Sequence, residues 1–408
     1  MQQEIEDVTF LRDRLSEFGC PKMAAAIPFT SYNCVKLANN IWFSIVHIKE
    51  DSHTPYGVFT TSAAVDKSKD CSLRKAIFEA CERYILAASD YHTDKFTFQL
   101  ASESDKVFRS PYKFRFGGTD VQKPLQLYPT SPFGNHRSRD SHVYVTDCFA
   151  PISIKGSFCN FLPSTNGVAC GSTFDAAVEA AVSELVERDS IMRFWYMGQR
   201  DGFFKLNTSQ SNMAELAPYL YLRNFGYDLY FLKCNSGPLK TVFTIAIHKS
   251  ENFPFSFCSA GTKMKLDDAI ESSLNEAVQT LVALSQSGAN VKKWLESEIG
   301  VKHLEHHMYY YSMRSLSENA IKGFLYEFFQ LEESFAGTAD ENSIGILDYA
   351  SEYLDCSAVD LTPDNFSNEL SVCRVLSSNA LPLFIGETLP PKDVIENQLR
   401  LPFPHPFP

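Results

Sequence analysis

The chain has 408 residues, of which 44% are hydrophobic and 13% aromatic, enough for a large folded core. Its formal net charge of −12 argues against nucleic acid or an anionic membrane surface as the main partner. The eleven cysteines are scattered and contain no Cys-x-x-Cys pair, which indicates reduced, mostly buried thiols and excludes a disulfide framework. The N-terminus lacks the features of a signal peptide, and no apolar run reaches the roughly eighteen residues of a membrane span. We therefore expect a cytoplasmic protein.

The first part of the chain predicts helices and strands in alternation. A helical pattern covers residues 4–18, and the apolar run 41–47 predicts a strand. The next helix, around residues 73–85, is amphipathic and carries Glu79-Ala-Cys-Glu82-Arg83 away from its apolar side.

Two further strands are predicted at residues 96–100 and 143–147. The stretch 110–141 between them is long, polar and mixed in composition. It predicts an ordered loop over a site, a mobile lid or a plain surface loop, and the surface loop is favoured.

A tight turn and a long helix follow at residues 166–195. Gly167 and Gly171 permit backbone angles that other residues avoid, and Ser172 or Thr173 is placed to cap the helix. Apolar residues at helical spacing form the stripe that faces the core: Val178, Val182, Leu185 and Val186.

A second stripe of this helix carries charge. Glu184, Glu187 and Arg188 lie three and four residues apart and form one compact patch. Ala177 and Ala181 continue the stripe, and such small residues leave room for a bound group. Taken alone, the triplet is typical of a solvated helix face.

After residue 195 the pattern predicts a helix over 213–224 and two strands, 227–235 and 241–248, joined at Ser236-Gly-Pro. A third acidic helix then carries Ser272, Glu276 and Gln279. Asp267 or Asp268 is placed to cap this helix.

Two other groups of residues have the chemistry of a site. His303, His306 and His307 share one helical face, but no Cys or carboxylate motif matches them, so a structural role is favoured over a metal site. Cys170 lies near a helix N-terminus, where the pKa of a thiol can fall, but no histidine is placed by the sequence to assist it as a nucleophile.

The three acidic helices align on one glutamate. The aligned triplets are Lys75, Glu79 and Glu82; Ala180, Glu184 and Glu187; and Ser272, Glu276 and Gln279. Hard cations such as Mg²⁺ prefer oxygen ligands and accompany nucleotide phosphates, so convergence of these groups suits a metal–nucleotide complex. Arg188 or Arg83 would bind phosphate. Because no Walker-type Gly-x-x-x-x-Gly-Lys occurs, such a site is not a P-loop. The recurrence predicts related structural units around one central site.

These motifs together resemble those of the YcaO proteins, over roughly residues 70–408. The resemblance is carried by Ser164-Thr-Asn166-Gly167-Val-Ala-Cys-Gly171-x-Thr173, Glu184-Leu-Val-Glu187-Arg188-Asp189, Ser272-x-x-x-Glu276-x-x-Gln279 and the terminal Leu401-Pro-Phe-Pro-His-Pro-Phe-Pro408. The last run is similar to the Pro-x-Pro-x-Pro terminus of family members that form azoline rings in ribosomally made peptides.

The resemblance implies an α+β fold of mixed or antiparallel sheets packed with helices around a central ATP site. It implies a YcaO domain over residues 61–408, including the Pro-rich tail 401–408, and leaves residues 1–60 as a partner-docking segment. The implied activity is an ATP-dependent cyclodehydratase. A Cys, Ser or Thr side chain of a precursor peptide adds to the preceding amide carbonyl, the oxyanion takes the γ-phosphoryl of ATP, and phosphate leaves as the azoline forms.

The resemblance also assigns roles to residues. The Mg²⁺ ligands would be Glu79, Glu82, Glu184, Glu187 and Glu276. The ATP contacts would be Asn166, Glu79, Glu184, Arg188, Ser272, Glu276 and Gln279. The catalytic residues would be Arg188 and Pro408, whose carboxylate is the candidate general base. Alternating prolines fix an extended path, and the phenylalanines favour insertion of the tail into the body over a disordered tail or an SH3-type ligand.

The implied partners are a precursor peptide, an E1-like subunit that binds its leader, and a flavin-dependent dehydrogenase that oxidises azolines. No nucleic acid or membrane partner is expected. Within the same family, formation of thioamides or macroamidines is an alternative. From another class, a non-catalytic nucleotide-binding scaffold is the alternative.

Overall fold

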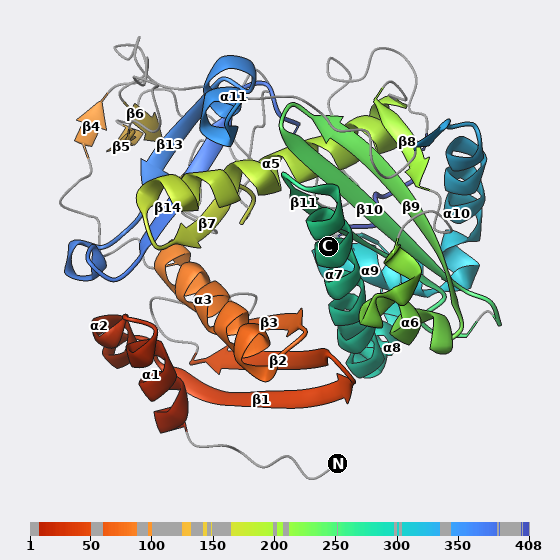
Figure 1. Cartoon of the computed structure of the whole chain (residues 1–408), viewed down its shortest axis with the longest axis horizontal. Coiled ribbons are helices and arrows are strands. Elements are labelled where there is room, and N and C mark those ends of the chain that lie inside the picture. Colours follow the sequence, from red (N-terminus) through yellow and green to blue (C-terminus); the bar gives the residue numbers. More distant parts are fainter. Residues whose placement is uncertain are drawn as a thin grey trace. The chain divides into compact units, whose positions relative to one another are not determined.

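The computed structural model describes residues 8–49, 60–87, 97–99, 125–131, 142–144, 148, 165–198, 202–206, 212–250, 252–297, 300–301, 304–334, 344–381, 383, 401 and 403–407. The chain divides into two compact units (Figure 1). Unit 1 comprises Met1–Leu37, Trp42–Leu185 and Ile344–Pro382. Unit 2 comprises Ala38–Ile41, Val186–Ser343 and Leu383–Pro408.

The described residues of unit 1 form three small sheets. The first sheet has the order β1-β2-β3 and consists of β1 (Phe29–Ala38), β2 (Ile41–Ile48) and β3 (Thr61–Asp66). The second has the order β13-β14-β7 and consists of β13 (Cys356–Asp360), β14 (Ser371–Ser377) and β7 (Val168–Gly171). The third consists of β4 (Thr97–Gln99), β5 (Leu125–Pro129) and β6 (His142–Tyr144). The helices are α1 (Val8–Glu17), α2 (Pro21–Ala26), α3 (Lys69–Ala87), α11 (Ile346–Tyr353) and the short η6 (Asp364–Phe366).

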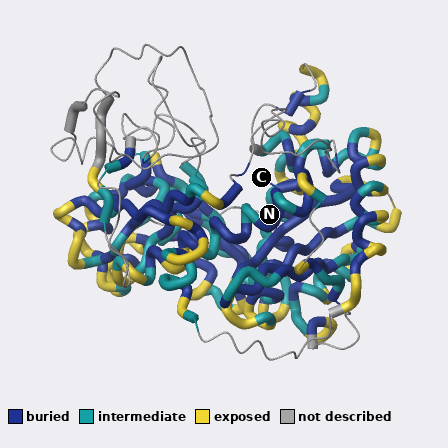
Figure 2. The backbone as a smooth tube through the Cα atoms, turned by 90° about the horizontal axis from the view of Figure 1, so that it is seen from above, coloured by how far each residue is buried: buried dark blue, intermediate teal, exposed yellow. Residues whose placement is uncertain are grey.

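One hydrophobic core joins the early and late parts of unit 1. Figure 2 shows the buried residues of the whole chain in dark blue. Leu11 and Leu15 of α1, Ile77 of α3 and Val372 of β14 are all fully buried members of the core of unit 1. The buried positions of α3 recur three and four residues apart, so one apolar stripe packs inward. The described residues 8–49 therefore share their core with residues that follow later in unit 1.

Unit 2 is built on a five-stranded sheet with the order β11-β10-β9-β8-β12. Its strands are β8 (Phe203–Leu206), β9 (Tyr227–Ser236), β10 (Leu239–His248), β11 (Ser256–Lys263) and β12 (Glu333–Ser334). All neighbours are antiparallel except β12, which pairs in parallel with β8. The helices are η5 (Asn212–Glu215), α6 (Ala217–Asn224), α7 (Leu266–Gln286), α8 (Gly288–Glu296), α9 (Leu304–Ser312) and α10 (Arg314–Phe329). Helix α5 (Phe174–Met197) begins in unit 1 and ends in unit 2.

A strand followed by a helix recurs three times with the same spacing. In β3–α3, β7–α5 and β11–α7 alike, two residues separate the end of the strand from the start of the helix. Each strand end is followed thirteen residues later by a glutamate, from Asp66 to Glu79, from Gly171 to Glu184 and from Lys263 to Glu276. The three glutamates are therefore structurally equivalent, as the alignment of the acidic helices predicted.

Two of these glutamates bind the edge of their own strand. Glu79 Oε2 accepts a hydrogen bond from the Ala63 backbone N–H at 3.2 Å, and Glu276 Oε2 accepts one from the Ala260 N–H at 3.3 Å. Both pairs are sixteen residues apart, and β3 and β11 are both edge strands. Each carboxylate thus satisfies a donor that a sheet edge leaves unpaired. Val168, the third equivalent residue, instead donates its N–H to the Thr165 carbonyl oxygen.

The predicted α+β architecture of mixed and antiparallel sheets is confirmed. The predicted strands at 41–47, 227–235 and 241–248 correspond to β2, β9 and β10. The sequence offered Ser172 or Thr173 as the cap of α5. Thr173 Oγ1 accepts the Ala176 N–H at 3.2 Å, so Thr173 is confirmed as the cap. Among the described helices, none has the length and apolarity that crossing a membrane requires.

Several local predictions are wrong. Asp267 and Asp268 lie inside the first turn of α7, whose N-cap is Lys265 without a side-chain bond. The predicted helix over 213–224 is broken into η5 and α6, because Pro218 lacks an N–H and occupies a helix start. The stretch 110–141 contains strand β5 in its described part. Ala177 and Ala181 are fully buried, so they leave no open space for a bound group.

The close packing of β11 on α7 gives a test of the third strand–helix unit. A Cβ added at Gly261 would lie 2.5 Å from Ala269 O and from Ser273 N, both backbone atoms. We expect Gly261→Ala to lower the free energy of unfolding by about 1–3 kcal/mol, the usual cost of overpacking. Denaturant unfolding measures the change. Gly288→Ala is the matched control, since nothing lies within 4 Å of its added Cβ. Equal stability of the two variants would contradict this packing.

Candidate functional site

Unit 1 brings together three of the predicted carboxylates. Glu79 and Glu82 of α3 and Glu184 of α5 are close enough to interact through their charges. Burial raises the pKa of Glu82 well above its ordinary value, and the charges of Glu184 and Glu79 raise it further, while Arg83 opposes them. A bound cation would stabilise the charged form of Glu82 beside these two carboxylates.

Arg83 binds two groups of unit 1, its own unit. Its Nη2 donates to Glu79 Oε1 at 2.6 Å, and its Nη1 donates to the Thr61 carbonyl oxygen at 2.7 Å. Since Glu79 Oε2 already accepts the Ala63 N–H, both oxygens of Glu79 have partners in this structure. Arg83 therefore orients Glu79.

The turn that holds Asn166 is fixed by backbone contacts. Gly167 has a φ of +73°, and a Cβ there would collide with the Val375 carbonyl oxygen. The Gly167 carbonyl in turn accepts the Val375 N–H at 2.7 Å, which ties the turn to β14. Half-buried Asn166 thus sits on a rigid segment.

Cys170 does not have the properties of a nucleophile. Burial raises the pKa of its thiol far above the ordinary value, and the nearby charge of Glu82 adds to the increase. The thiol donates to the Phe78 carbonyl oxygen at 3.6 Å. All ten cysteines in the described ranges are free, and seven are buried, in agreement with the prediction of reduced thiols.

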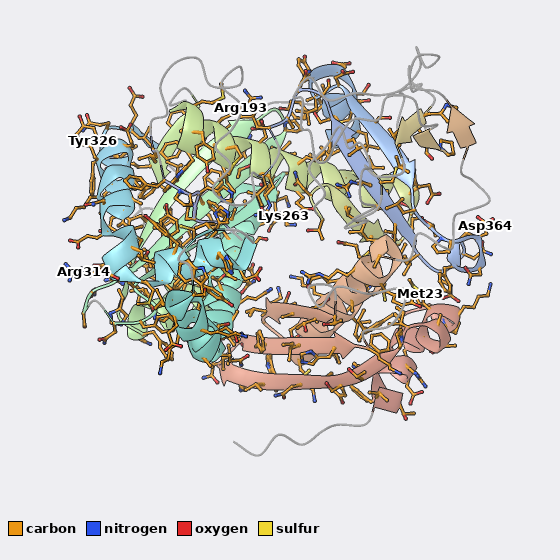
Figure 3. All side chains as sticks on the ribbon, turned by 180° about the vertical axis from the view of Figure 1, so that it is seen from behind. Met23, Arg193, Lys263, Arg314, Tyr326 and Asp364 are labelled. Atoms are coloured by element: carbon orange, nitrogen blue, oxygen red, sulfur yellow. The ribbon has the colours of Figure 1, made fainter. Side chains whose placement is uncertain are left out.

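Unit 2 holds Glu187 beside Arg188, as the sequence indicated, and beside two groups that the sequence did not connect with it. Glu187 is 9% exposed, and burial raises the pKa of its carboxyl group. The charges of Arg188 and Lys263 and a hydrogen bond from the Thr262 hydroxyl oppose this increase. Lys263, labelled in Figure 3, is the last residue of β11, and it pairs with Lys240 on the neighbouring strand β10. The charge of Lys263 and the hydroxyl of Thr262 are thus additions to the predicted set.

Helix α7 presents the third acidic motif in unit 2. Ser272, Glu276 and Gln279 are half-buried, and spacings of four and three place them on one side of the helix. Glu276 is oriented by the Ala260 N–H described above. The predicted residues are therefore distributed as Glu79, Glu82, Asn166 and Glu184 in unit 1, and Glu187, Arg188, Ser272, Glu276 and Gln279 in unit 2.

The C-terminal tail is buried in unit 2, as predicted from its phenylalanines. Leu401, His405 and Phe407 are at most 3% exposed. The Phe407 ring packs against Phe243 of β10 at a centroid distance of 5.9 Å. Pro408, the predicted general base, lies outside the described residues.

The histidine cluster is structural in the described part. His307 is fully buried, donates to the His405 carbonyl oxygen at 2.8 Å and stacks on the His405 ring at 4.1 Å. His303 lies outside the described residues. Across the described ranges, no three His, Cys, Asp or Glu side chains come close enough to hold a metal ion by themselves.

A family model decides the identity. The model described as YcaO cyclodehydratase, ATP- and Mg²⁺-binding, matches residues 66–380. The chain belongs to the YcaO family. The resemblance found in the sequence is thereby confirmed, and so are ATP and Mg²⁺ as the cofactors that the family binds. No curated protein matches the chain in sequence.

Solved structures share the YcaO fold at low identity. A YcaO from Methanopyrus kandleri bound with AMPPCP and Mg²⁺ is 15% identical over 91% of this chain and 89% of its own, with a TM-score of 0.62. The E. coli microcin synthetase McbBCD complex with pro-MccB17 bound contains a chain that is 14% identical over 95% and 98%, with a TM-score of 0.67. A heterocyclase in complex with substrate and cofactor is 14% identical over 91% of this chain and 52% of its own, with a TM-score of 0.65.

The residues present fit the cofactors of the YcaO family. Mg²⁺ keeps several waters and is usually held by one or two carboxylates together with substrate phosphates, so a complete protein cage is not required. Glu184 and Glu79 disfavour the charge of Glu82, which is the electrostatic setting that a divalent cation relieves. Arg188 and Lys263 near Glu187 supply positive charge of the kind that phosphate groups need.

The buried His307 predicts how acid affects this YcaO protein. Burial lowers the pKa of His307 from 6.5 to about 4, so the folded state favours the neutral ring. The stability that neutral His307 contributes is fully present above pH 6.5 and is lost as the pH falls towards 4. In that range His307 binds a proton in the unfolded chain but stays neutral in the folded chain. We expect wild type to lose about 2 kcal/mol more than His307→Asn in unfolding free energy between pH 7 and pH 5. Denaturant unfolding at both pH values measures this. Between pH 7 and pH 8 the two proteins should change alike, and a difference there would contradict the assignment.

Proposed function

We propose that this YcaO protein converts Cys, Ser or Thr residues of a ribosomally made precursor peptide into thiazolines or oxazolines in an ATP-dependent reaction. ATP, with Mg²⁺ neutralising its phosphates, supplies the phosphoryl group that makes the amide oxygen a good leaving group. The ring closes when the side-chain nucleophile has added to the amide carbon and phosphate has left. Family membership supports cyclodehydration, and the azoline product is our own inference.

The docked tail is the observation that carries this choice of product. Its prolines alternate up to Pro408, and its main chain is held in unit 2 through Phe407. A tail held in this way is suited to presenting a terminal carboxylate at a fixed place. A thioamide-forming enzyme or a nucleotide-binding scaffold has no evident use for such a device.

The chain's residues divide into three roles in this proposal. Glu79, Glu82, Glu184, Glu187 and Glu276 hold Mg²⁺. Asn166, Ser272 and Gln279, with Glu79, Glu184, Glu276 and Arg188, contact ATP. Arg188 stabilises charge on the transferring phosphoryl group, and the carboxylate of Pro408 accepts a proton from the cyclising peptide. We add Lys263 to the phosphate contacts because its charge acts on Glu187.

Partners belong to the same proposal. The E. coli neighbour is a synthetase complex with pro-MccB17 bound, which supports a precursor peptide and partner subunits for this chain. We expect an E1-like subunit to bind the leader and a flavin-dependent dehydrogenase to oxidise the azolines, all in the cytoplasm. Residues 1–60 are the proposed docking segment. The part of it that packs in the core of unit 1, from Leu11 to Ile48, would give a partner a fixed surface.

The mass of the peptide tests the reaction directly. The candidate precursor encoded beside this gene would be co-expressed with the neighbouring genes, with and without this chain. Loss of whole waters only when the chain is present is the expected result, with loss of hydrogen pairs if a dehydrogenase acts. Replacement of oxygen by sulfur would show a thioamide enzyme instead. An unchanged mass with all partners present would favour the scaffold.

Two substitutions test the assigned site. Glu187→Ala and Gln279→Ala should each lower ATP-dependent peptide modification by about a hundredfold or more, because each removes a group that positions charge during phosphoryl transfer. Circular dichroism and thermal unfolding should show that both variants are folded. Glu179→Ala is the control on the same helix as Glu187, since Glu179 is exposed. Full activity in either site variant would remove that residue from the site.

Extension of the tail tests the role of Pro408. One alanine added after Pro408 should lower kcat by about a hundredfold, the smaller end of what a positioned general base contributes, while ATP still binds. Rates of peptide modification and a separate ATP-binding measurement separate the two effects. The control carries the extra alanine before the N-terminal methionine. An undiminished kcat after C-terminal extension would exclude the terminal carboxylate as the base.

A further inference from the structure

The tail has an unusual hydrogen-bonding problem. Prolines at 402, 404, 406 and 408 leave only every second residue with a backbone N–H, so no strand can pair with the segment through a regular ladder. Its main chain instead offers carbonyl oxygens. A protein surface that holds such a segment must supply donors from side chains, as the aromatic grooves that bind polyproline helices do.

Unit 2 supplies these donors in a row. Trp195 Nε1 donates to the Phe403 carbonyl oxygen at 3.0 Å, and the Tyr311 hydroxyl donates to the Pro404 carbonyl oxygen at 2.6 Å. His307 Nδ1 donates to the His405 carbonyl oxygen at 2.8 Å. Three consecutive carbonyls are thus bound by three side chains that are at most 2% exposed.

Both ends of the clamped segment are anchored by apolar side chains. Leu401 packs so closely on α10 that a Cβ added at Gly323 would lie 3.0 Å from its Cδ2 atom. Phe407 packs on Phe243. Phe403, between the anchors, is only half-buried, so its carbonyl is bound while its side chain is partly exposed.

The bonds of the two stacked histidines fix their protonation. A carbonyl oxygen only accepts, so His307 carries its proton on Nδ1. The Phe407 N–H donates to His405 Nδ1 at 3.3 Å, so that nitrogen is unprotonated. The His405 N–H donates to the Tyr196 hydroxyl at 3.3 Å. The N–H groups of His405 and Phe407 therefore have partners as well.

We propose that Trp195, Tyr311 and His307 form a main-chain clamp whose function is to position the end of the tail for the reaction. The clamp binds the backbone of residues 403–405, and the side chains of Leu401 and Phe407 anchor the segment on either side. Phe407 is therefore a fixed point, and Pro408 is the next residue of the chain. The three are positioning residues, since they bind the tail and not the substrate. The positioning role of these residues rests on the proposed function of Pro408. The binding of the tail by the clamp does not depend on that function.

Hydrogen exchange of the tail measures clamping without any activity. The C-terminal peptide from Leu401 reports exchange of the Phe403, His405 and Phe407 amides only, and the latter two donate to the Tyr196 hydroxyl and to the His405 ring. In the full chain, Trp195→Phe and Tyr311→Phe should each speed this exchange roughly tenfold, because each leaves a buried carbonyl without its donor. Tyr310→Phe is the matched control, since Tyr310 is half-buried and its buried neighbour Tyr311 makes the tail contact. His307→Asn keeps an N–H donor and should disturb exchange less than His307→Ala.

Variants of the tail itself guard against general unfolding. Phe407→Ala should speed exchange because it removes an anchor, whereas Phe403→Ala should change it little because the clamp binds the carbonyl. Equal exchange in wild type and both clamp variants would overturn the clamp. A large effect of Phe403→Ala together with none of Phe407→Ala would overturn main-chain recognition.

Kinetics decide what the clamp is for. Tyr311→Phe should lower kcat for peptide modification roughly tenfold with an unchanged KM for ATP. Across the clamp variants, the decrease in kcat should be larger where the C-terminal peptide exchanges its amide hydrogens faster. Faster exchange with an unchanged kcat would overturn the positioning role. If wild type modifies no peptide while the exchange differences are present, the proposed function fails and the clamp stands.

Discussion

A glutamate bound to the edge of its own strand determines how helices are placed in this YcaO protein. Glu79 accepts the Ala63 N–H and Glu276 accepts the Ala260 N–H, each across sixteen residues of chain. The connection between strand and helix is two residues long in both cases, so the helix has little freedom to slide. One hydrogen bond thus satisfies a donor at a sheet edge and fixes the orientation of a carboxylate. Motifs that look like catalytic signatures in the sequence are also structural, and loss of Glu79 or Glu276 should be interpreted with both roles in mind.

The electrostatic consequence is concentrated negative charge. In unit 1, burial and the neighbours Glu79 and Glu184 both disfavour ionisation of Glu82. Arg83 offsets part of this charge, but it is already bound to Glu79 and to the Thr61 carbonyl. In unit 2, by contrast, Glu187 is surrounded by Arg188, Lys263 and the Thr262 hydroxyl. The carboxylates of unit 1 therefore suit a divalent cation, and the surroundings of Glu187 suit anionic phosphates.

Sequence reasoning found the features that depend on spacing within one element. The three acidic helices, the cap at Thr173 and the hairpin β9–β10 all follow from local periodicity or turn chemistry. It missed Lys263 and Thr262, because their proximity to Glu187 depends on how β11 packs and not on any motif. It also misjudged Ala177 and Ala181, since small residues permit close packing as readily as they permit a ligand. The choice between these outcomes depends on tertiary contacts that spacing does not encode.

The tail shows how far a composition argument can reach. Alternating prolines predict an extended segment without backbone pairing, and this follows from the chain alone. They also imply that any receptor must bind carbonyls with side-chain donors, but they do not say which ones. Trp195, Tyr311 and His307 come from two helices far apart in sequence, and only the fold brings their donors into one row. The neutral His405 ring accepts the Phe407 N–H at Nδ1, whereas His307 Nδ1 donates to the His405 carbonyl oxygen whether or not its Nε2 carries a second proton. These hydrogen bonds to the main chain of the tail are made within unit 2.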